Sequence, residues 1–127
     1  MAESKAGGGG ARERGRAMFE QVMRFPAPRL EGDLFLDVTT DHLFAEVWAR
    51  PGLAVRDRRL VTLTLLACLG NESTLKLHFG AAMRSGDLSD VEIDELLLHI
   101  AHYAGWPPAA VASQVVRQLR AERDKGK

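Results

Sequence analysis

The sequence predicts an all-α protein, a single-domain bundle of about six helices. No stretch alternates apolar and polar residues over the roughly four to eight positions that mark a half-buried strand. Helix start and stop signals are frequent instead, and a chain of 127 residues has the size of one domain with one core. We expect a flexible tail over residues 1–10, which include four consecutive glycines, and one helical domain over 11–127.

Capping residues mark the predicted helix ends. Ser89 can cap the amide three residues on, and Glu92 can reach back to the Ser89 amide, so this pair marks a helix start. Gly86 and Gly105 suit helix ends because glycine adopts the left-handed conformation at low cost. Pro107 suits a first helical turn, where a missing amide hydrogen costs little. The predicted helices are 11–24, 40–49, 57–69, 72–85, 89–104 and 107–124, and 25–37 is predicted to be irregular.

Two predicted helices differ in the distribution of their apolar residues. Within 57–69 apolar side chains cover nearly the whole circumference, so this helix should be surrounded, either at the bundle centre or in a subunit interface. In the helix 89–104, by contrast, Glu95, His99 and His102 share a polar side. The opposite, apolar side consists of Ile93, Leu96, Leu97, Ile100, Ala101 and Ala104. Val91 and Leu98 lie beside the polar stripe, so this second face also carries apolar surface. Together with the run 60–69 it exceeds what a small bundle needs to bury, which predicts a homo-oligomer.

Composition and charge exclude several classes of function. The 17 basic and 17 acidic side chains give a formal net charge of zero, so neither nucleic acid nor a membrane is an expected partner. The longest strongly apolar run, 60–69, is far shorter than the roughly 20 residues that span a bilayer. Cys68 is the only cysteine, which excludes an intrachain disulfide and a cysteine-cluster metal site. The N-terminus shows no secretory signal, so we expect a soluble, cytoplasmic protein.

Three motifs follow one another at a characteristic spacing. They are Glu46 to Leu53 running on to Arg58, Leu75 to His78 followed by Ala81, Ala82 and Gly86, and Glu92 and Ile93 through His99 to Tyr103, Ala104, Gly105, Trp106 and Pro107. Together they resemble the carboxymuconolactone decarboxylase family, within the alkylhydroperoxidase D-like superfamily, over Phe44 to Ala112. The resemblance implies an all-helical subunit that assembles as a trimer or as a hexamer made of dimers.

One branch of that superfamily consists of thiol-dependent peroxidases with a Cys-x-x-Cys pair just before a histidine. If His78 is that histidine, the pair would fall at Asn71 and Thr74, and neither is a cysteine. The assisting glutamate of that branch would fall at Arg59. Because Cys68 has no resolving partner in the chain, thiol peroxidase activity is not expected.

The other branch removes carbon dioxide from a small lactone of aromatic catabolism, without metal or organic cofactor. That reaction needs positive charge at the substrate carboxylate and an acid that protonates the dienolate formed when carbon dioxide leaves. His78 is the candidate acid, and Arg50 and Arg58 are the candidate carboxylate ligands. Four further residues are candidates for substrate binding: Glu72, His99, Tyr103 and Trp106.

One departure from the family pattern leaves the activity open. The decarboxylases have a glutamate four residues before the histidine, where this chain has Thr74, and Glu72 matches only a less constant acid. A divergent member that binds a ligand or serves in assembly, without catalysis, is therefore the alternative. In that case His78 is a hydrogen-bonded core histidine, and Arg50 and Arg58 have structural roles.

Glu95, His99 and His102 allow a third interpretation, a metal-assisted enzyme. Their spacing presents a carboxylate and two imidazoles on one side of a helix. Three ligands along two turns of one helix do not readily converge on one ion, so hydrogen bonding in an interface is the preferred interpretation. We expect no metal and no cofactor.

Overall fold

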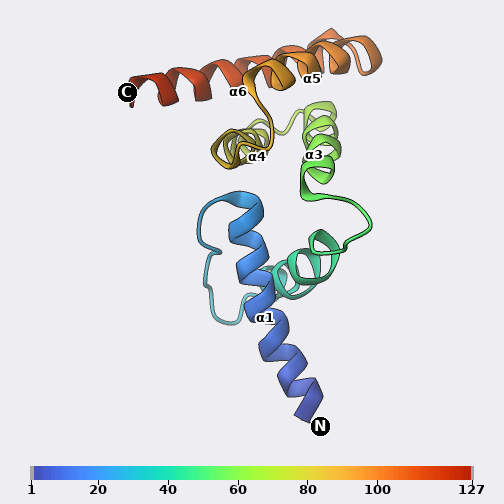
Figure 1. The fold of residues 1–127 in the computed structure, drawn as a ribbon, viewed down its shortest axis with the longest axis vertical. Helices are drawn as coiled ribbons and strands as arrows, with labels where there is room; N and C mark the ends of the chain where they lie inside the picture. The colour runs from blue at the N-terminus through green and yellow to red at the C-terminus, as the bar shows by residue number, and fades with distance from the viewer. Residues whose placement is uncertain (1, 127) are drawn as a thin grey trace. The chain divides into compact units, whose positions relative to one another are not determined.

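A computed structural model describes residues 2–126, and no strand occurs among them (Figure 1). The helices are α1 (Ala2–Met23), α2 (Leu34–Val38), the π-helix η1 (Thr39–Trp48), α3 (Val55–Leu69), α4 (Glu72–Ser85), α5 (Asp90–Tyr103) and α6 (Trp106–Lys125). The predicted all-α class is confirmed. The chain divides into two compact units at the bond between Val55 and Arg56, and each unit has an apolar core of its own. A single domain over 11–127 stays a prediction.

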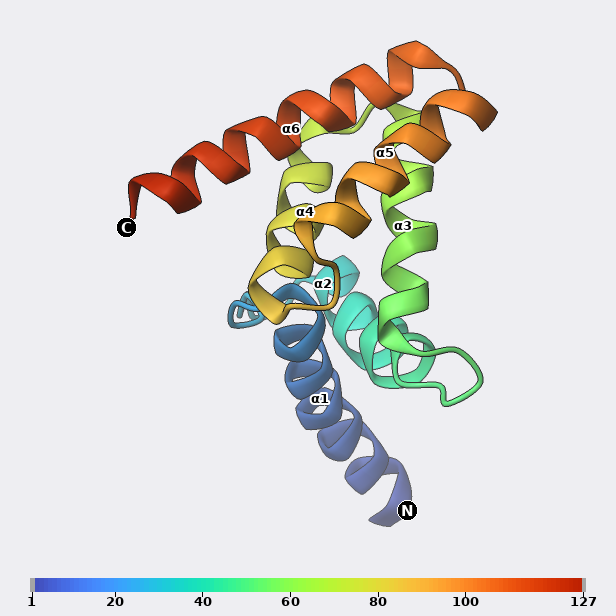
Figure 2. The same cartoon turned by 45° about the horizontal axis from the view of Figure 1, so that its top comes forward.

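The core of the first unit lies between α1 and η1, which are side by side in Figures 1 and 2. Phe19, Val22 and Met23 of α1 pack with Phe44 and Trp48 of η1. The rings of Phe19 and Phe44 meet edge to face with centroids 4.8 Å apart, and those of Phe44 and Trp48 stack at 6.2 Å. Aromatic pairs in these arrangements stabilise beyond the area they bury.

The backbones of α1 and η1 come into contact at Gly15. A Cβ at this position would lie 1.9 Å from the carbonyl oxygen of Thr40, so only a residue without a side chain fits. One turn earlier, Arg12 binds Asp41 with two hydrogen bonds, from Nε at 2.6 Å and from Nη2 at 2.8 Å. The hydrogen bonds from Arg12 hold the pKa of the Asp41 carboxyl below its usual value.

The helix predicted over 40–49 is present, but Thr39–Trp48 is wound as a π-helix rather than an α-helix. The prediction that 25–37 is irregular is wrong over its last four residues, 34–37, which belong to α2. Asp33 caps α2, because its Oδ1 accepts a hydrogen bond from the Leu36 amide at 2.9 Å. The helix α1 begins at Ala2 instead of residue 11, and the flexibility of residues 1–10 stays a prediction.

The second unit contains α3 to α6, and both α4 and α5 contact α6. Figure 2 shows α6 turning back along α5. The predicted capping box of α5 is confirmed, because the Glu92 amide donates to Ser89 Oγ at 3.1 Å and the Ser89 amide donates to Glu92 Oε1 at 2.9 Å. Gly86 ends α4 with a φ of 77°, as predicted. The core of this unit includes Leu63, Leu75, Phe79, Ile93, Ile100, Ala112 and Val116.

The helix α3 is only partly surrounded. Leu63 and Ala67 are buried, whereas Val61, Leu65 and Leu69 are 53%, 57% and 78% exposed. A place at the centre of the bundle is therefore wrong for α3, and the exposed stripe of Val61, Leu65 and Leu69 leaves the interface alternative.

The helix α5 follows its predicted apolar face except at its end, where Ala104 is exposed instead of buried. No helix among residues 2–126 combines the length and apolar character needed to cross a membrane.

Candidate functional site

His78 lies on the buried face of α4. Leu75, Phe79 and Ala82 are buried on the same face, at spacings of three, one and four residues from His78. His78 is consequently only 9% exposed. The helix begins at Asn71, whose Oδ1 accepts a hydrogen bond from the Thr74 amide at 3.2 Å and so fixes the rotation of the first turn.

The surroundings of His78 favour its neutral form. Burial in the first place, and the positive charge of Arg59 in the second, lower the pKa of His78 from 6.5 to about 4. At neutral pH the ring therefore carries one N–H donor and one nitrogen acceptor. It is suited to donate one hydrogen bond and to accept another before any ligand binds.

Arg59 is the buried cation of this region, and the structure places its charge near His78. It is 1% exposed and lies on the buried face of α3 with Leu63 and Ala67. Its Nε donates to Asp87 Oδ2 at 2.7 Å. The sequence drew attention to Arg59 only because it occupies the position where the peroxidase branch has its assisting glutamate. Its spacing of four and eight residues from Leu63 and Ala67 was the signal that it would be buried.

The two predicted carboxylate ligands occupy different units. Arg58 is half-buried on α3, and as the residue before Arg59 it projects from a different side of that helix. Arg50 is exposed just after η1 in the first unit, and its amide donates to the Val47 carbonyl at 3.1 Å. The convergence of Arg50, Arg58 and His78 stays a prediction.

Three of the predicted substrate-binding residues are exposed at the end of α5 and the start of α6. His99 stacks on Tyr103 with centroids 4.8 Å apart, and Tyr103 is 84% exposed. Nδ1 of His102 donates to the Leu98 carbonyl at 2.7 Å, and its ring meets Trp106 edge to face at 5.8 Å. The structure thus brings His99 together with Tyr103, and Trp106 together with His102, as surface pairs.

Glu72 and Trp106 line two different pockets. Trp106 lines a pocket of about 370 Å³ between α5 and α6, together with Leu98 and Ala109. Glu72 is exposed in the first turn of α4 and lines a pocket of about 590 Å³ together with Lys76. His78 lines neither, so a shared substrate wall stays a prediction.

The metal interpretation receives no support from the geometry. Among the residues whose side chains are described, no three His, Cys, Asp or Glu side chains lie close enough to hold a metal ion, and this covers Glu95, His99 and His102. Cys68 is exposed on α3.

The structure is all-helical over the described residues, and the buried histidine is the last residue of the Leu75 to His78 motif. The chain belongs to the carboxymuconolactone decarboxylase family, whose model matches residues 33–118. That match covers α2, η1, the connection with Arg50, α3 to α5 and α6 as far as residue 118.

Two curated relatives show what this chain is similar to. It is 40% identical over 76 residues to the 4-carboxymuconolactone decarboxylase of Acinetobacter baylyi, a match that covers 60% of this chain and 56% of that protein. It is 34% identical over 84 residues to a nitrosuccinic acid decarboxylase of Metarhizium robertsii, covering 65% of this chain and 56% of that protein. The chain therefore matches little more than half the length of these relatives. No solved structure matches it significantly.

Proposed function

We propose that the chain is a decarboxylase of a small acid whose carboxylate lies beside an electron-accepting group, with a carboxylated lactone as the leading substrate. The main support for this proposal is the similarity to two decarboxylases, within a family match that contains Arg58 and His78. The two named substrates share one chemical property. A conjugated lactone carbonyl in the first and a nitro group in the second can accept the electron pair that the departing carbon dioxide leaves behind.

The proposed reaction has two steps. In the first, the bond between the carboxylate carbon and the substrate skeleton breaks, carbon dioxide leaves, and the electron pair moves into the lactone carbonyl to form a dienolate. In the second, a proton adds to carbon and restores the carbonyl. The protein must bind the carboxylate, donate hydrogen bonds to the developing oxyanion and deliver that proton.

We assign two of these tasks to His78, the hydrogen bond to the oxyanion and the delivery of the proton. With a pKa of about 4 the free ring is neutral at pH 7, so it acts first as a hydrogen-bond donor. A bound anionic substrate raises the pKa of a neighbouring imidazole, because negative charge stabilises the imidazolium. The ring becomes a competent acid only in the complex, which refines the role expected from the sequence.

We assign the binding of the substrate carboxylate to guanidinium groups. Arg58 is half-buried on the helix that carries Arg59, and its fork can bind a carboxylate with two hydrogen bonds. Arg50 has the same chemistry in the first unit. Four further candidates are exposed, and we assign them a role in substrate binding only within a homo-oligomer, the trimer or hexamer that the family resemblance implies. They are Glu72, His99, Tyr103 and Trp106.

Direct assay tests the proposal. Purified protein is incubated with 4-carboxymuconolactone and, separately, with nitrosuccinate, while ultraviolet absorbance and released carbon dioxide are followed. We expect carbon dioxide release with the wild type and a loss of at least about a hundredfold in His78→Asn, since general acid catalysis contributes about 10² to 10⁴. No release from either substrate at high protein concentration would refute the proposal.

Thr74 offers a sharper variant. It is the third residue of α4, where a glutamate is well tolerated near the helix N-terminus. Thr74→Glu restores the family carboxylate and is expected to raise the rate. Ser73→Glu adds the same charge to the same turn and is the matched control, which should leave the rate unchanged.

The alternative is a divergent member that binds such an acid without converting it, which Thr74 favours. Calorimetry with the lactone separates the two functions. The alternative is supported if both the wild type and Thr74→Glu bind the lactone saturably, with neither substrate loss nor carbon dioxide release.

A further inference from the structure

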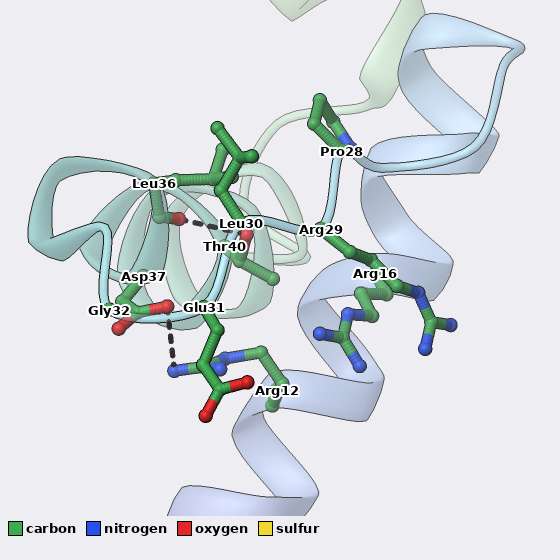
Figure 3. A pocket seen from close by; sticks show the side chains of 10 residues that line it. All are labelled: Arg12, Arg16, Pro28, Arg29, Leu30, Glu31, Gly32, Leu36, Asp37 and Thr40. Atoms are coloured by element: carbon green, nitrogen blue, oxygen red, sulfur yellow. Dashed lines mark hydrogen bonds and ion pairs between the residues drawn. The ribbon is translucent and has the colours of Figure 1, made fainter.

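The first unit contains a pocket of about 440 Å³ that the proposed reaction does not use. It lies between α1, the connection that follows it, and α2 with the start of η1 (Figure 3). Its volume falls in the range of small-molecule sites, roughly 300 to 1,000 Å³. Three arginines line it, namely Arg12, Arg16 and Arg29.

Arg12 is already neutralised. It forms the two-bond pair with Asp41, and its Nη2 also lies 3.3 Å from Asp37 Oδ1. Thr40, another lining residue, donates its hydroxyl hydrogen to the Leu36 carbonyl at 3.0 Å. These groups therefore form a fixed wall of the pocket.

Arg16 and Arg29 are different. Among the residues whose side chains are described, neither forms a hydrogen bond or an ion pair with a carboxylate, and Figure 3 shows both side chains extending over the same stretch of α1. The charge of Arg16 reaches Asp41 only through space, where it contributes to the lowered pKa of that carboxyl. Two guanidinium groups at one pocket repel each other until an anion lies between them.

The remaining lining limits the charge of the occupant. Glu31 and Asp37 also line the pocket, and Asp37 and Asp41 are both paired with Arg12. The two remaining cations, Arg16 and Arg29, therefore share the pocket with the Glu31 carboxylate, which disfavours a dianion. Pro28, Leu30 and Leu36 add apolar surface. A ligand with one negative charge and an apolar body fits this lining better than a small dianion such as phosphate.

We propose that this pocket binds a small organic monocarboxylate, whose charged end is held by Arg16 and Arg29 and whose body lies on Leu30 and Leu36. The guanidinium forks provide the directional hydrogen bonds for a carboxylate. This site would be additional to the region around His78, and it involves no residue assigned to the proposed reaction.

Titration of the full chain with benzoate tests the proposal, with the arginine Nε–Hε resonances of labelled protein as the readout. We expect saturable shifts at Arg16 and Arg29 in the wild type, and an affinity at least about tenfold lower in R16Q/R29Q. R14Q/R24Q removes the same charge from exposed arginines outside the pocket and is expected to keep the wild-type affinity. R16K/R29K keeps the charge but loses the fork, so it should also weaken binding and serves if the glutamine variant does not fold.

Three results would overturn the proposal. They are the absence of saturable shifts at Arg16 and Arg29 up to about 20 mM benzoate, equal loss of affinity in R16Q/R29Q and R14Q/R24Q, and inorganic phosphate displacing benzoate at equal concentration. Failure of benzoate to bind here would leave the decarboxylase proposal intact, because that proposal is read from carbon dioxide release. His78→Asn is expected to leave benzoate affinity at Arg16 and Arg29 unchanged.

Discussion

Arg59 and Asp87 form an ion pair in which the cation is almost completely buried and the carboxylate is partly open to solvent. Arg59 Nε donates to Asp87 Oδ2 at 2.7 Å, and the side chains are 1% and 32% exposed. The Asp87 amide in turn donates to Ser85 Oγ at 3.2 Å, and its carbonyl accepts a hydrogen bond from Arg56 at 3.1 Å. The pair therefore joins α3 to the connection between α4 and α5.

Asp87→Asn should destabilise the protein, because it removes the negative charge beside a buried guanidinium. We expect a loss of about 1 to 3 kcal/mol in the free energy of unfolding, measured by urea denaturation. Asp94→Asn is the control, since its pair with Arg120 at 2.9 Å is exposed and should contribute less than about 1 kcal/mol. Equal losses in the two variants would show that burial of Arg59 does not strengthen its pair.

His78 should make stability depend on pH. Between pH 4 and 6.5 the unfolded chain binds a proton at this ring that the folded chain does not. The free energy of unfolding should therefore rise with pH across this window, by up to about 3 kcal/mol from this one group. In denaturation at pH 4.5, 5.5 and 7, His78→Asn should lose that part of the slope, whereas exposed His42→Asn should keep it. An unchanged slope in His78→Asn would contradict the lowered pKa.

Gly15→Ala should be strongly destabilising despite the better helix propensity of alanine. The added Cβ would lie 1.9 Å from the Thr40 carbonyl oxygen, so α1 and η1 would have to separate. We expect a loss of at least about 2 kcal/mol. Gly52→Ala is the matched control, because no atom lies within 4 Å of a Cβ there. Equal thermal midpoints for Gly15→Ala and Gly52→Ala would rule out the close approach.

The exposed stripe of α3 is predicted to be buried in an interface with a second copy of the chain. Val61, Leu65 and Leu69 are spaced four residues apart and more than half exposed, so we expect a homo-oligomer that Leu65→Glu weakens. Light scattering at micromolar concentration measures the mass. Leu34→Glu, at a residue 76% exposed on α2, is the control and should leave the assembly intact. A wild-type mass equal to that of one chain would contradict the predicted homo-oligomer.

Local signals made much of the fold predictable. The limits of α4 coincide with the prediction, and the capping box of α5 forms as expected, because caps are interactions between residues three positions apart. The winding of η1 and the existence of α2 were not predictable in this way. A five-residue helix shows no period, and nothing local in the sequence of Thr39–Trp48 distinguishes π from α winding.

The candidate site was predictable only in its residue types. The motif around His78 indicated an important histidine, and a core position was predicted only under the alternative without catalysis. Arg59 was missed as the source of nearby positive charge, because nothing in the sequence pairs it with Asp87, 28 residues later. Such a pair is a product of tertiary structure, and the sequence offered only the spacing of Arg59 from Leu63 and Ala67.

The π winding of η1 also affects which changes in chain length the protein can accept. A deletion inside Thr39–Trp48 can be absorbed where the helix tightens to α winding, because each π turn contains an extra residue. The same deletion in the middle of α3 would rotate everything beyond it by about 100°. Ala67 would then turn outward, so natural length variation should accumulate in η1 and be absent from α3.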